Sequence, residues 1–256
     1  MPMQLKEYVV SVLLPVHNAA QFLPECLESL QKQTHGDIQI IAIDDHSKDD
    51  SFAILKRAKR QFKGLEVYRN KKRYGLAVCY NRALKLSRGR FVAFMNPSDI
   101  NGLNRFKRQV AFLLKNPKTV AVGTQYTSIT AENKKLERSN LPEGNEEIYD
   151  NLLSISSLHP ETVMINRHLL PKDLLHFKSP KYPFVFTEVF VKLFQYGKVA
   201  NIAHSLYFHR EGVRRHGRKH SKMKQMTSTV KLWLTSRANH DYRPSLRSVF
   251  PQLVKN

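Results

Sequence analysis

The chain has 256 residues, of which 41% are hydrophobic and 25% are charged. This length and this hydrophobic content indicate a globular chain with one large domain and exclude a disordered protein. Its 42 lysines and arginines outnumber its 21 acids, so the formal net charge is +21. Such a charge is typical of proteins that meet nucleic acid, an anionic membrane face or a phosphate-bearing ligand.

Three further features bear on the compartment. No apolar run reaches the ~18 residues that a membrane-spanning helix needs. The first residues do not resemble a signal peptide, because Glu7 precedes an apolar segment that is short and strand-like. Two cysteines, Cys26 and Cys79, are too few for a disulfide framework or a zinc site. Together these features predict a cytoplasmic protein.

The first half of the chain alternates between predicted strands and predicted helices. Strands are expected at 8–15, 38–43, 65–68, 91–95 and 120–124, and helices at 20–33, 51–61, 77–86 and 103–114. Short apolar runs rich in β-branched residues are typical of strands that are buried on both faces. Short connections between strands and helices indicate a parallel, doubly wound sheet over roughly the first 125 residues.

The second half is less regular. Residues 131–151 are polar and turn-rich, which predicts an excursion over the surface. Apolar sequence resumes at 152–165 and is followed by a predicted helix at 188–196 and a strand at 199–202. The remainder is basic, with one amphipathic helix candidate at 226–233.

Polar side chains follow two of the predicted strands. The second strand ends in Asp44 and Asp45, with more acids and hydroxyls up to Ser51, and the fourth ends in the stretch from Asn96 to Asp99. The carboxyl ends of parallel strands form the ligand edge of an open α/β sheet. We therefore expect Asp45 and Asp99 to lie side by side. Helix capping is the alternative, but capping needs only one or two such residues.

Four segments, taken in order, resemble the inverting family 2 glycosyltransferases. They read VSVLLPVHNAAQFLPECLESLQKQT, IIAIDDHSKDDS, RNKKRYGLAVCYNRALKLSRGRFVAFMNPSD and SLHPETVMINRHLL. The resemblance implies an α/β protein with the GT-A fold, a Rossmann-like, mainly parallel sheet flanked by helices. It also implies transfer of a sugar from a nucleotide sugar to a glycan or lipid-linked acceptor. We predict a nucleotide-sugar half at 1–125, an acceptor-side half at 126–210 and a basic C-terminal extension at 211–256.

The resemblance also assigns site residues. The nucleotide would lie against Pro15, His17, Asp44, Asp45, Arg73, Asn96 and Asp99. In this family a DxD motif holds Mg²⁺ or Mn²⁺, but here Asn96 stands at the leading position and Asp99 is the remaining metal ligand. One carboxylate plus substrate phosphates can hold Mg²⁺. Both a metal-dependent and a metal-independent reaction therefore stay open.

The remaining assignments are for the diphosphate, the catalytic base and the acceptor. Arg210, Arg214 and Arg215 belong to the densest basic block, which would face the diphosphate or, alternatively, rest on anionic lipid. Glu188 is the predicted catalytic base, although Val185 and Phe186 replace the acids of the family motif. His159, which Glu161 nearly adjoins, matches a position on the acceptor side, and a buried structural histidine is the alternative.

Two other readings remain. Because the metal and base motifs are eroded, the chain could bind a nucleotide sugar or glycan with weak or absent turnover. A nucleic-acid binder rests on the charge alone, since no recognition motif accompanies it. The leading prediction is a cytoplasmic glycosyltransferase, peripheral on the inner membrane face, where basic residues favour an anionic leaflet.

Overall fold

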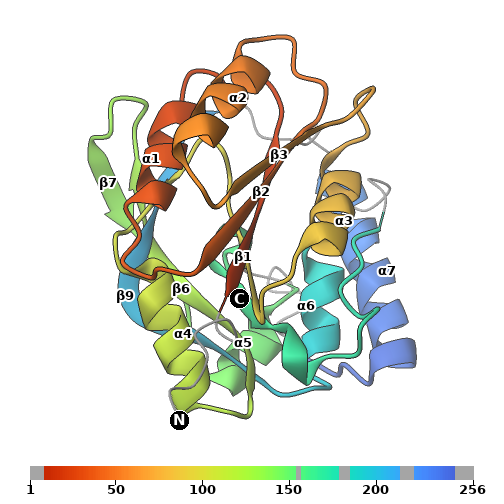
Figure 1. Cartoon of the computed structure of the whole chain (residues 1–256). Helices are drawn as coiled ribbons and strands as arrows, with labels where there is room; N and C mark the ends of the chain where they lie inside the picture. The colour runs from red at the N-terminus through yellow and green to blue at the C-terminus, as the bar shows by residue number, and fades with distance from the viewer. Residues whose placement is uncertain (1–8, 154–156, 179–184, 214–221, 246–256) are drawn as a thin grey trace.

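The structure of the protein is a computed structural model, which describes residues 9–153, 157–178, 185–213 and 222–245. In these ranges nine strands form one sheet, with helices on both of its faces (Figure 1). The strands are β1 (Val10–Val16), β2 (Ile38–Asp44), β3 (Leu65–Arg69), β4 (Phe91–Phe94), β5 (Ile100–Asn101), β6 (Thr119–Ile129), β7 (Lys135–Arg138), β8 (Met164–Asn166) and β9 (Lys198–Arg210). The α-helices are α1 (Leu23–Gln31), α2 (Ser51–Gln61), α3 (Leu76–Leu86), α4 (Arg105–Lys115), α5 (Asn145–Asn151), α6 (Thr187–Leu193) and α7 (Lys222–His240).

The strand order is β3-β2-β1-β4-β8-β6-β9-β5, and β7 pairs with β6 outside this path. Strands β3, β2, β1 and β4 are parallel, as predicted. The next predicted strand, β6, runs in the same direction as these four but does not pair with β4. The short strand β8 lies between β4 and β6 and is antiparallel to both, while β6 and β9 are parallel to each other. The sheet is therefore mixed.

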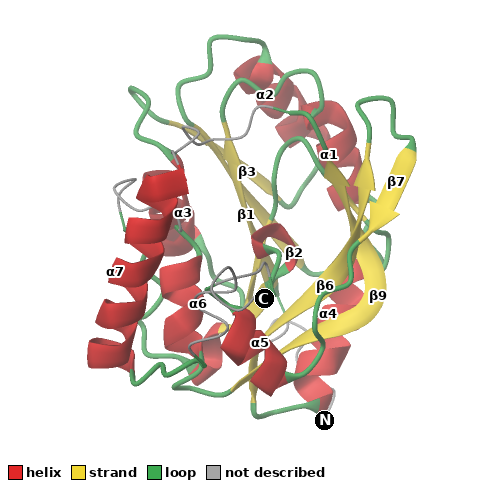
Figure 2. Cartoon of the chain, turned by 180° about the vertical axis from the view of Figure 1, so that it is seen from behind, coloured by secondary structure: helices red, strands yellow, loops and turns green. Residues whose placement is uncertain are grey.

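The two faces of the sheet bury two separate hydrophobic clusters. Val10, Val12 and Leu14 of β1 pack with α1, α2 and α4, whereas Leu13 packs on the opposite face with α3, α6 and α7. Successive side chains of a strand point to opposite faces, so an uninterrupted apolar strand supplies both clusters. Figure 2 shows α3, α6 and α7 together on one side of the sheet and α1, α2 and α4 on the other.

The parallel strands end at one edge, which the loops after β1, β2 and β4 form. Helix α2 begins at Ser51, immediately after the β2 loop, and α3 begins at Leu76 after Gly75, whose φ is +93°. A positive φ of this kind favours glycine, so Gly75 fixes the turn into α3. The helices thus start at the carboxyl edge and run back along the sheet.

Two predictions for the second half need correction. The stretch 131–151 is not only a surface excursion, because it contains β7 and α5. Strand β9 has 13 residues rather than four, since it pairs with β6 over most of the length of both strands. The predicted boundary between residues 125 and 126 falls inside β6. Within the described ranges, no helix has the length and apolarity required to cross a bilayer.

Candidate functional site

Side chains of the β2 loop hold the loop that follows β1. Ser47 Oγ accepts a hydrogen bond from the backbone N–H of Asn18 at 3.0 Å, and Ser51 Oγ accepts one from Ala19 at 2.8 Å. Asp49 Oδ2 accepts from Ala20 at 2.9 Å. Much of the polar surplus after β2 therefore stabilises the two loops against each other, which the capping alternative did not anticipate.

Asp45 is an acid whose carboxylate is fully engaged. It is 1% exposed, and its Oδ1 accepts from Asn70 Nδ2 and from the backbone N–H of Tyr74, both at 2.8 Å. Its Oδ2 accepts from Gly75 N–H, also at 2.8 Å. Burial by itself raises the pKa of Asp45, but the hydrogen bonds from Tyr74, Asn70 and Gly75 together outweigh it, so the pKa falls below 3.8. No sequence pattern predicted the role of Asn70.

Asp44 differs from its neighbour, because one of its oxygens has no partner among the described residues. Oδ2 pairs with Arg69 Nε at 3.0 Å and accepts from Ser47 N–H at 3.3 Å. Oδ1 is buried and accepts no hydrogen bond from any described residue. A buried acceptor without a donor costs about 1–3 kcal/mol. The end of β2 therefore offers a strong acceptor for an N–H or O–H group of a ligand.

The other predicted nucleotide residues of this edge lie around these acids. Pro15 is buried within β1, and His17 Nδ1 lies 2.9 Å from the backbone oxygen of Asp45. Arg73 is exposed in the loop that precedes Tyr74. The structure thus brings Pro15, His17, Asp44 and Asp45 together, with Arg73 on the adjoining loop.

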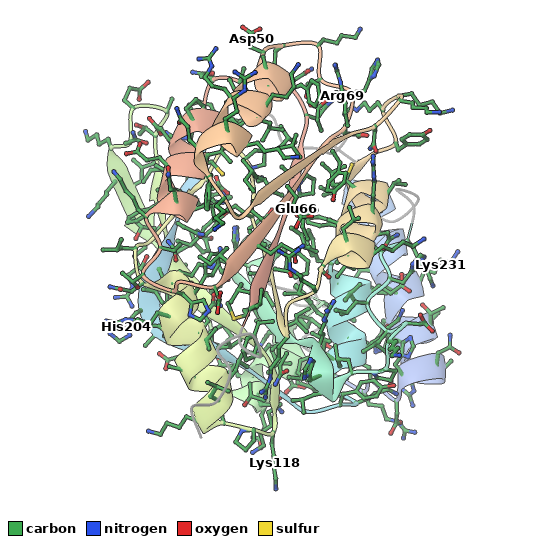
Figure 3. The ribbon with its side chains drawn as sticks, viewed as in Figure 1. Asp50, Glu66, Arg69, Lys118, His204 and Lys231 are labelled. Atoms are coloured by element: carbon green, nitrogen blue, oxygen red, sulfur yellow. The ribbon has the colours of Figure 1, made fainter. Side chains whose placement is uncertain are left out.

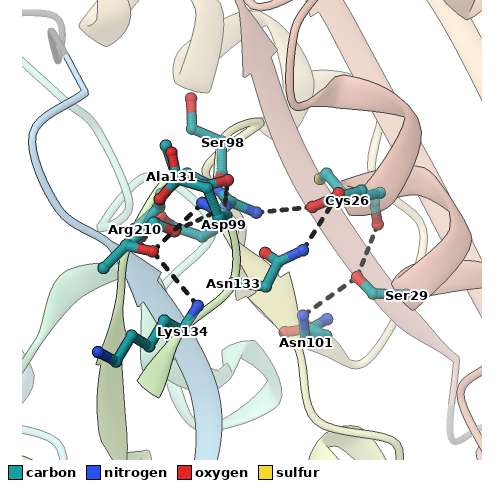
Figure 4. Close-up of polar contacts among 12 residues, drawn as sticks. Cys26, Ser29, Ser98, Asp99, Asn101, Ala131, Asn133, Lys134 and Arg210 are labelled. Atoms are coloured by element: carbon teal, nitrogen blue, oxygen red, sulfur yellow. Dashed lines mark hydrogen bonds and ion pairs between the residues drawn. The ribbon is translucent and has the colours of Figure 1, made fainter. Parts of the chain in front are cut away.

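Asp99 belongs to a second network, around Arg210 (Figure 4). Asp99 is completely buried; Oδ2 accepts from Tyr207 Oη at 2.9 Å and Oδ1 accepts from Arg210 N–H at 2.8 Å. The Arg210 guanidinium donates to the carbonyl oxygens of Ser98, Thr130 and Ala131 and to Glu25 Oε2. These contacts connect β9 to α1 and to the loop after β4.

This network bears on the predicted roles of the basic residues and of Asp99. Arg210 is 0% exposed and its donors contact protein acceptors, so its environment does not fit the predicted contact with a diphosphate. Arg214 and Arg215 lie outside the described residues. In the described ranges the carboxylates of Asp45 and Asp99 have separate hydrogen-bond partners, and their side-by-side placement stays a prediction.

The residues at Asp99 do not fit a metal ion in this arrangement. Both of its oxygens accept hydrogen bonds from Tyr207 and Arg210, and Asn96 Oδ1 accepts from Ser98 N–H at 2.9 Å. Within the described ranges no group of three or more His, Cys, Asp and Glu side chains could hold a metal. A metal ligand role for Asp99 therefore requires a different conformation of its surroundings.

The predicted acceptor-side residue His159 lies close to the Asp99 network. Its Nε2 is 3.3 Å from Glu161 Oε2, and its ring centroid is 4.4 Å from Tyr126 and 4.7 Å from His209. His209 Nδ1 in turn lies 3.7 Å from Asp99 Oδ2. The structure therefore joins His159 and Asp99 through His209, and it adds Glu161 as a half-buried acid of this region.

Glu188 lies in the first turn of α6 and is paired with two lysines. Its Oε1 is 2.7 Å from Lys178 Nζ and 3.5 Å from Lys192 Nζ. Phe186, just before α6, packs on Phe94 at the end of β4, with ring centroids 5.3 Å apart. The helix therefore starts beside the carboxyl edge, while the Glu188 carboxylate contacts lysines.

Comparison with known families agrees with this arrangement. The sequence model described as "Glycosyl transferase family 2" matches residues 11–174, which is more than half of the chain. The chain therefore belongs to glycosyltransferase family 2. The matched range contains both acidic strand ends and the segment with His159.

The individual relatives share about 30% of their residues with this chain over the aligned region. The glucosyltransferase WfgD of Escherichia coli, named for UDP-Glc and α-D-GlcNAc-diphosphoundecaprenol, is 29% identical over 167 residues, which cover 65% of this chain and 63% of that protein. The poly(ribitol-phosphate) β-glucosyltransferase of Bacillus spizizenii is 31% identical over 117 residues, covering 44% and 18%. The chain spans less than two thirds of the length of these curated relatives.

The solved structures show the fold. S. aureus TarS (residues 1–349, in complex with UDP-GlcNAc) aligns with a TM-score of 0.75 at 20% identity, covering 92% of this chain and 68% of that one. The mannosyltransferase PcManGT of Pyrobaculum calidifontis, in complex with GDP-Man and Mn²⁺, aligns with a TM-score of 0.67 at 17% identity, covering 95% and 67%. The predicted α/β, GT-A-like fold is thereby confirmed.

Proposed function

We propose that this chain transfers a hexose from a nucleotide sugar to a glycan or lipid-linked acceptor with inversion at the sugar carbon. Family membership supports the reaction class. The relatives support the finer assignment, because they are named for UDP-Glc with a lipid-diphosphate acceptor and for a poly(ribitol-phosphate) acceptor. On this proposal the donor is a UDP-sugar and the enzyme works at the inner face of a membrane.

The observation that carries the proposal is the unpartnered oxygen of Asp44. It lies at the end of β2, between the loops that follow β1 and β3, and it belongs to a carboxylate of 0% exposure. An N–H of a pyrimidine base or a ribose hydroxyl would donate to it and remove the cost of an unsatisfied buried acceptor. His17 and Arg73 complete this nucleotide site in the proposal.

Two acids compete for the role of proton acceptor. Direct displacement at the sugar carbon needs a base within hydrogen-bond reach of the acceptor hydroxyl. Glu188 is the base in our proposal, and its carboxylate would have to be released by both Lys178 and Lys192. Glu161 is the alternative candidate for the base, because it contacts His159 on the predicted acceptor side. Arg214 and Arg215 stay proposed as the cations that meet the leaving diphosphate.

A second candidate function is donor binding with weak turnover. The full engagement of Asp99 by Tyr207 and Arg210 favours it, because this acid is then unable to ligate a metal at the diphosphate without rearrangement. The two candidates share the nucleotide site and differ in catalysis. Binding and turnover therefore have to be measured separately.

The binding experiment is a thermal-shift screen with UDP, GDP, CDP and TDP, each with and without Mn²⁺. A ligand at a hundred times its Kd stabilises the folded state by about 2.7 kcal/mol. That amounts to an increase of roughly 5–10 °C for a domain of this size. We expect UDP to give this shift and Asp44→Asn to abolish it. The matched control is Asp50→Asn, an exposed acid of the same loop, which should keep the shift.

The turnover experiment measures release of the sugar from the same donors, with and without a lipid-linked saccharide. We expect Glu188→Gln to lower kcat by about 10²-fold or more and Glu161→Gln to have a small effect. The reverse result would assign the base to Glu161. UDP binding without turnover on any donor would select the second candidate. Failure of every nucleotide to shift the wild-type protein would refute both.

A further inference from the structure

A pocket of about 530 Å³ lies between α2 and β3, at the edge of the sheet, and no site residue named so far except Arg69 lines it. Its walls come from α2 and β3. The lining residues are Phe52, Lys56, Lys59, Arg60, Val67 and Arg69. The four helix residues have the spacing of one helix face, and the two strand residues alternate so that both point to the α2 side. The pocket is thus formed by one face of α2 and the α2-facing side chains of the edge strand β3.

The lining of the pocket carries several basic side chains and no acidic side chain. Four of its six residues are cations, and none is an acid. Among the described residues, no carboxylate pairs with Lys56, Lys59 or Arg60, whereas Arg69 pairs with Asp44. The surrounding stretch 56–73 contains nine lysines and arginines and a single acid, Glu66. This surface therefore has unneutralised positive charge over a wide area.

The floor of the pocket is apolar and partly open. Phe52 is half-buried, with Arg69 4.5 Å and Lys56 5.1 Å from its ring centroid. Val67 is also half-buried. An aromatic ring among long basic side chains is the combination that settles at the boundary between lipid headgroups and acyl chains.

We infer that the α2–β3 pocket is where this protein docks on an anionic phospholipid surface. A site for one soluble phosphate would bring several donors, including backbone N–H groups, to one point. Here the donors are the tips of side chains distributed along a helix flank, which suits a surface with many phosphates. The inference deepens the proposed function, because a lipid-linked acceptor lies at such a surface.

The pocket adjoins the proposed nucleotide edge. Arg69 lines the pocket, and the same side chain pairs with Asp44 and donates to the backbone oxygen of Ser47 at 2.9 Å. Figure 3 shows Asp50 and Arg69 at one end of the molecule and Lys118 at the other. Docking through α2 would therefore hold the carboxyl edge of the sheet close to the membrane.

The experiment is co-sedimentation of the full chain with vesicles of phosphatidylcholine alone and of equal parts phosphatidylcholine and phosphatidylglycerol. The test variant replaces Lys56, Lys59 and Arg60 with alanine. The matched control replaces Lys107, Arg108 and Lys115, three exposed cations of α4, with alanine. Both variants lose two lysines and one arginine from an 11-residue helix. Helix α4 lies at the opposite end of the molecule from α2 (Figure 1).

Each lysine or arginine near an anionic leaflet contributes about fivefold to the partition coefficient. We expect the α2 variant to bind the anionic vesicles roughly a hundredfold more weakly, the α4 variant to bind within a few-fold of wild type, and neither wild type nor variant to bind phosphatidylcholine alone. Equal loss in both variants, or loss in neither, would overturn the inference.

Two further measurements, polyphosphate binding and the UDP thermal shift, separate this inference from its alternatives. If the α2 variant lost binding to soluble polyphosphate but kept binding to the anionic vesicles, the pocket would be a site for soluble phosphate polymers and the lipid inference would be wrong. The UDP thermal shift is measured on the same variants. An unchanged shift in the α2 variant, alongside lost vesicle binding, supports lipid docking independently of the nucleotide site. Unaltered vesicle binding with a normal UDP shift would reject the docking surface and leave the proposed function standing.

Discussion

Two acidic strand ends flank β1 in this protein, and they are held in opposite ways. Asp45, after β2, is held by Asn70, Tyr74 and Gly75, which all belong to one neighbouring loop. Asp99, after β4, is held by Tyr207 and by Arg210, more than 100 residues further along the chain. The comparison teaches that the β2 end is built from adjacent loops and leaves Asp44 available, whereas the β4 end joins the two halves of the sheet.

The largest effect is expected at Arg210. Replacing it with alanine leaves Glu25, the buried carbonyl oxygen of Ser98 and the partly buried carbonyl oxygens of Thr130 and Ala131 without this donor. Removal of one partner from a buried charged network costs about 4 kcal/mol. For a chain of this size the melting temperature should fall by roughly 12 °C. Calorimetry on the purified variant measures this.

The matched control is Arg88→Ala, which removes an arginine from an exposed pair with Glu66. Exposed pairs contribute under about 1 kcal/mol, so its melting temperature should change little. If Arg210→Ala behaved like Arg88→Ala, the Asp99 network would not connect the two halves of the sheet as described.

An intermediate effect is expected at Asp45. Replacement with asparagine removes a carboxylate that accepts three hydrogen bonds, at a cost of about 2 kcal/mol near neutral pH. Because the pKa of Asp45 is lowered below 3.8 in the folded state, its contribution is present above that value and is lost as the pH falls through the folded pKa. The stability difference between wild type and Asp45→Asn should therefore be constant near neutral pH and shrink below about pH 4.

Urea unfolding of both proteins across this pH range measures the difference directly. The comparison of the two proteins is necessary because the pKa values of Asp49 and Glu66 are also lowered, so the wild type alone reports several groups. A difference that stayed constant to the lowest pH would show that the three hydrogen bonds do not favour the charged carboxylate.

The smallest effect concerns the two buried thiols, one beside each acid. Cys79 Sγ accepts from Asn70 Nδ2 at 3.4 Å, and Cys26 contacts the carbonyl oxygen of Asn96. Burial raises the pKa of Cys79 to about 12 and also raises that of Cys26, so both thiols should react slowly in the native state. Because the loop after β3 adjoins the proposed nucleotide site, UDP should slow labelling of Cys79 a few-fold and leave Cys26 unchanged.

Thiol-labelling rates of Cys26→Ser and Cys79→Ser, each with one remaining cysteine, assign the two sites. Equal protection of both thiols by UDP would mean that the two strand ends respond as one unit and are not held independently.

The local pattern of the first half could be read from the sequence. Strands β1 to β4 and helices α1 to α4 lie close to their predicted positions, because apolar runs and helical periodicity are local properties. The insertion of β8 between β4 and β6 was not foreseen, since pairing between distant segments leaves no local signal. The full extent of β9 was also missed, because polar residues such as His204 and Ser205 interrupt its apolar pattern.

For the candidate site, the sequence predicts where polar residues gather but not how each side chain is held. The sequence located the acidic edge at Asp44 and Asp45, but it could not say which of two adjacent acids leaves an oxygen free. It also could not separate buried from exposed members of a basic composition: Arg105 and Arg210 are fully buried, whereas Arg73 is exposed. The capacity of Asp99 to hold a metal depends on Tyr207, which is distant in sequence.

Strand β8 has a consequence for the exchange of parts between relatives. Its three residues, Met164–Asn166, pair on one side with β4 and on the other with β6, so in the described part of the sheet the first four strands pair with the rest only through a segment encoded far downstream. Recombination that imports a foreign N-terminal half must therefore also import a compatible β8. Diversification of such an enzyme should proceed by changing loops and side chains at the edge of the sheet, while the sheet itself is inherited whole.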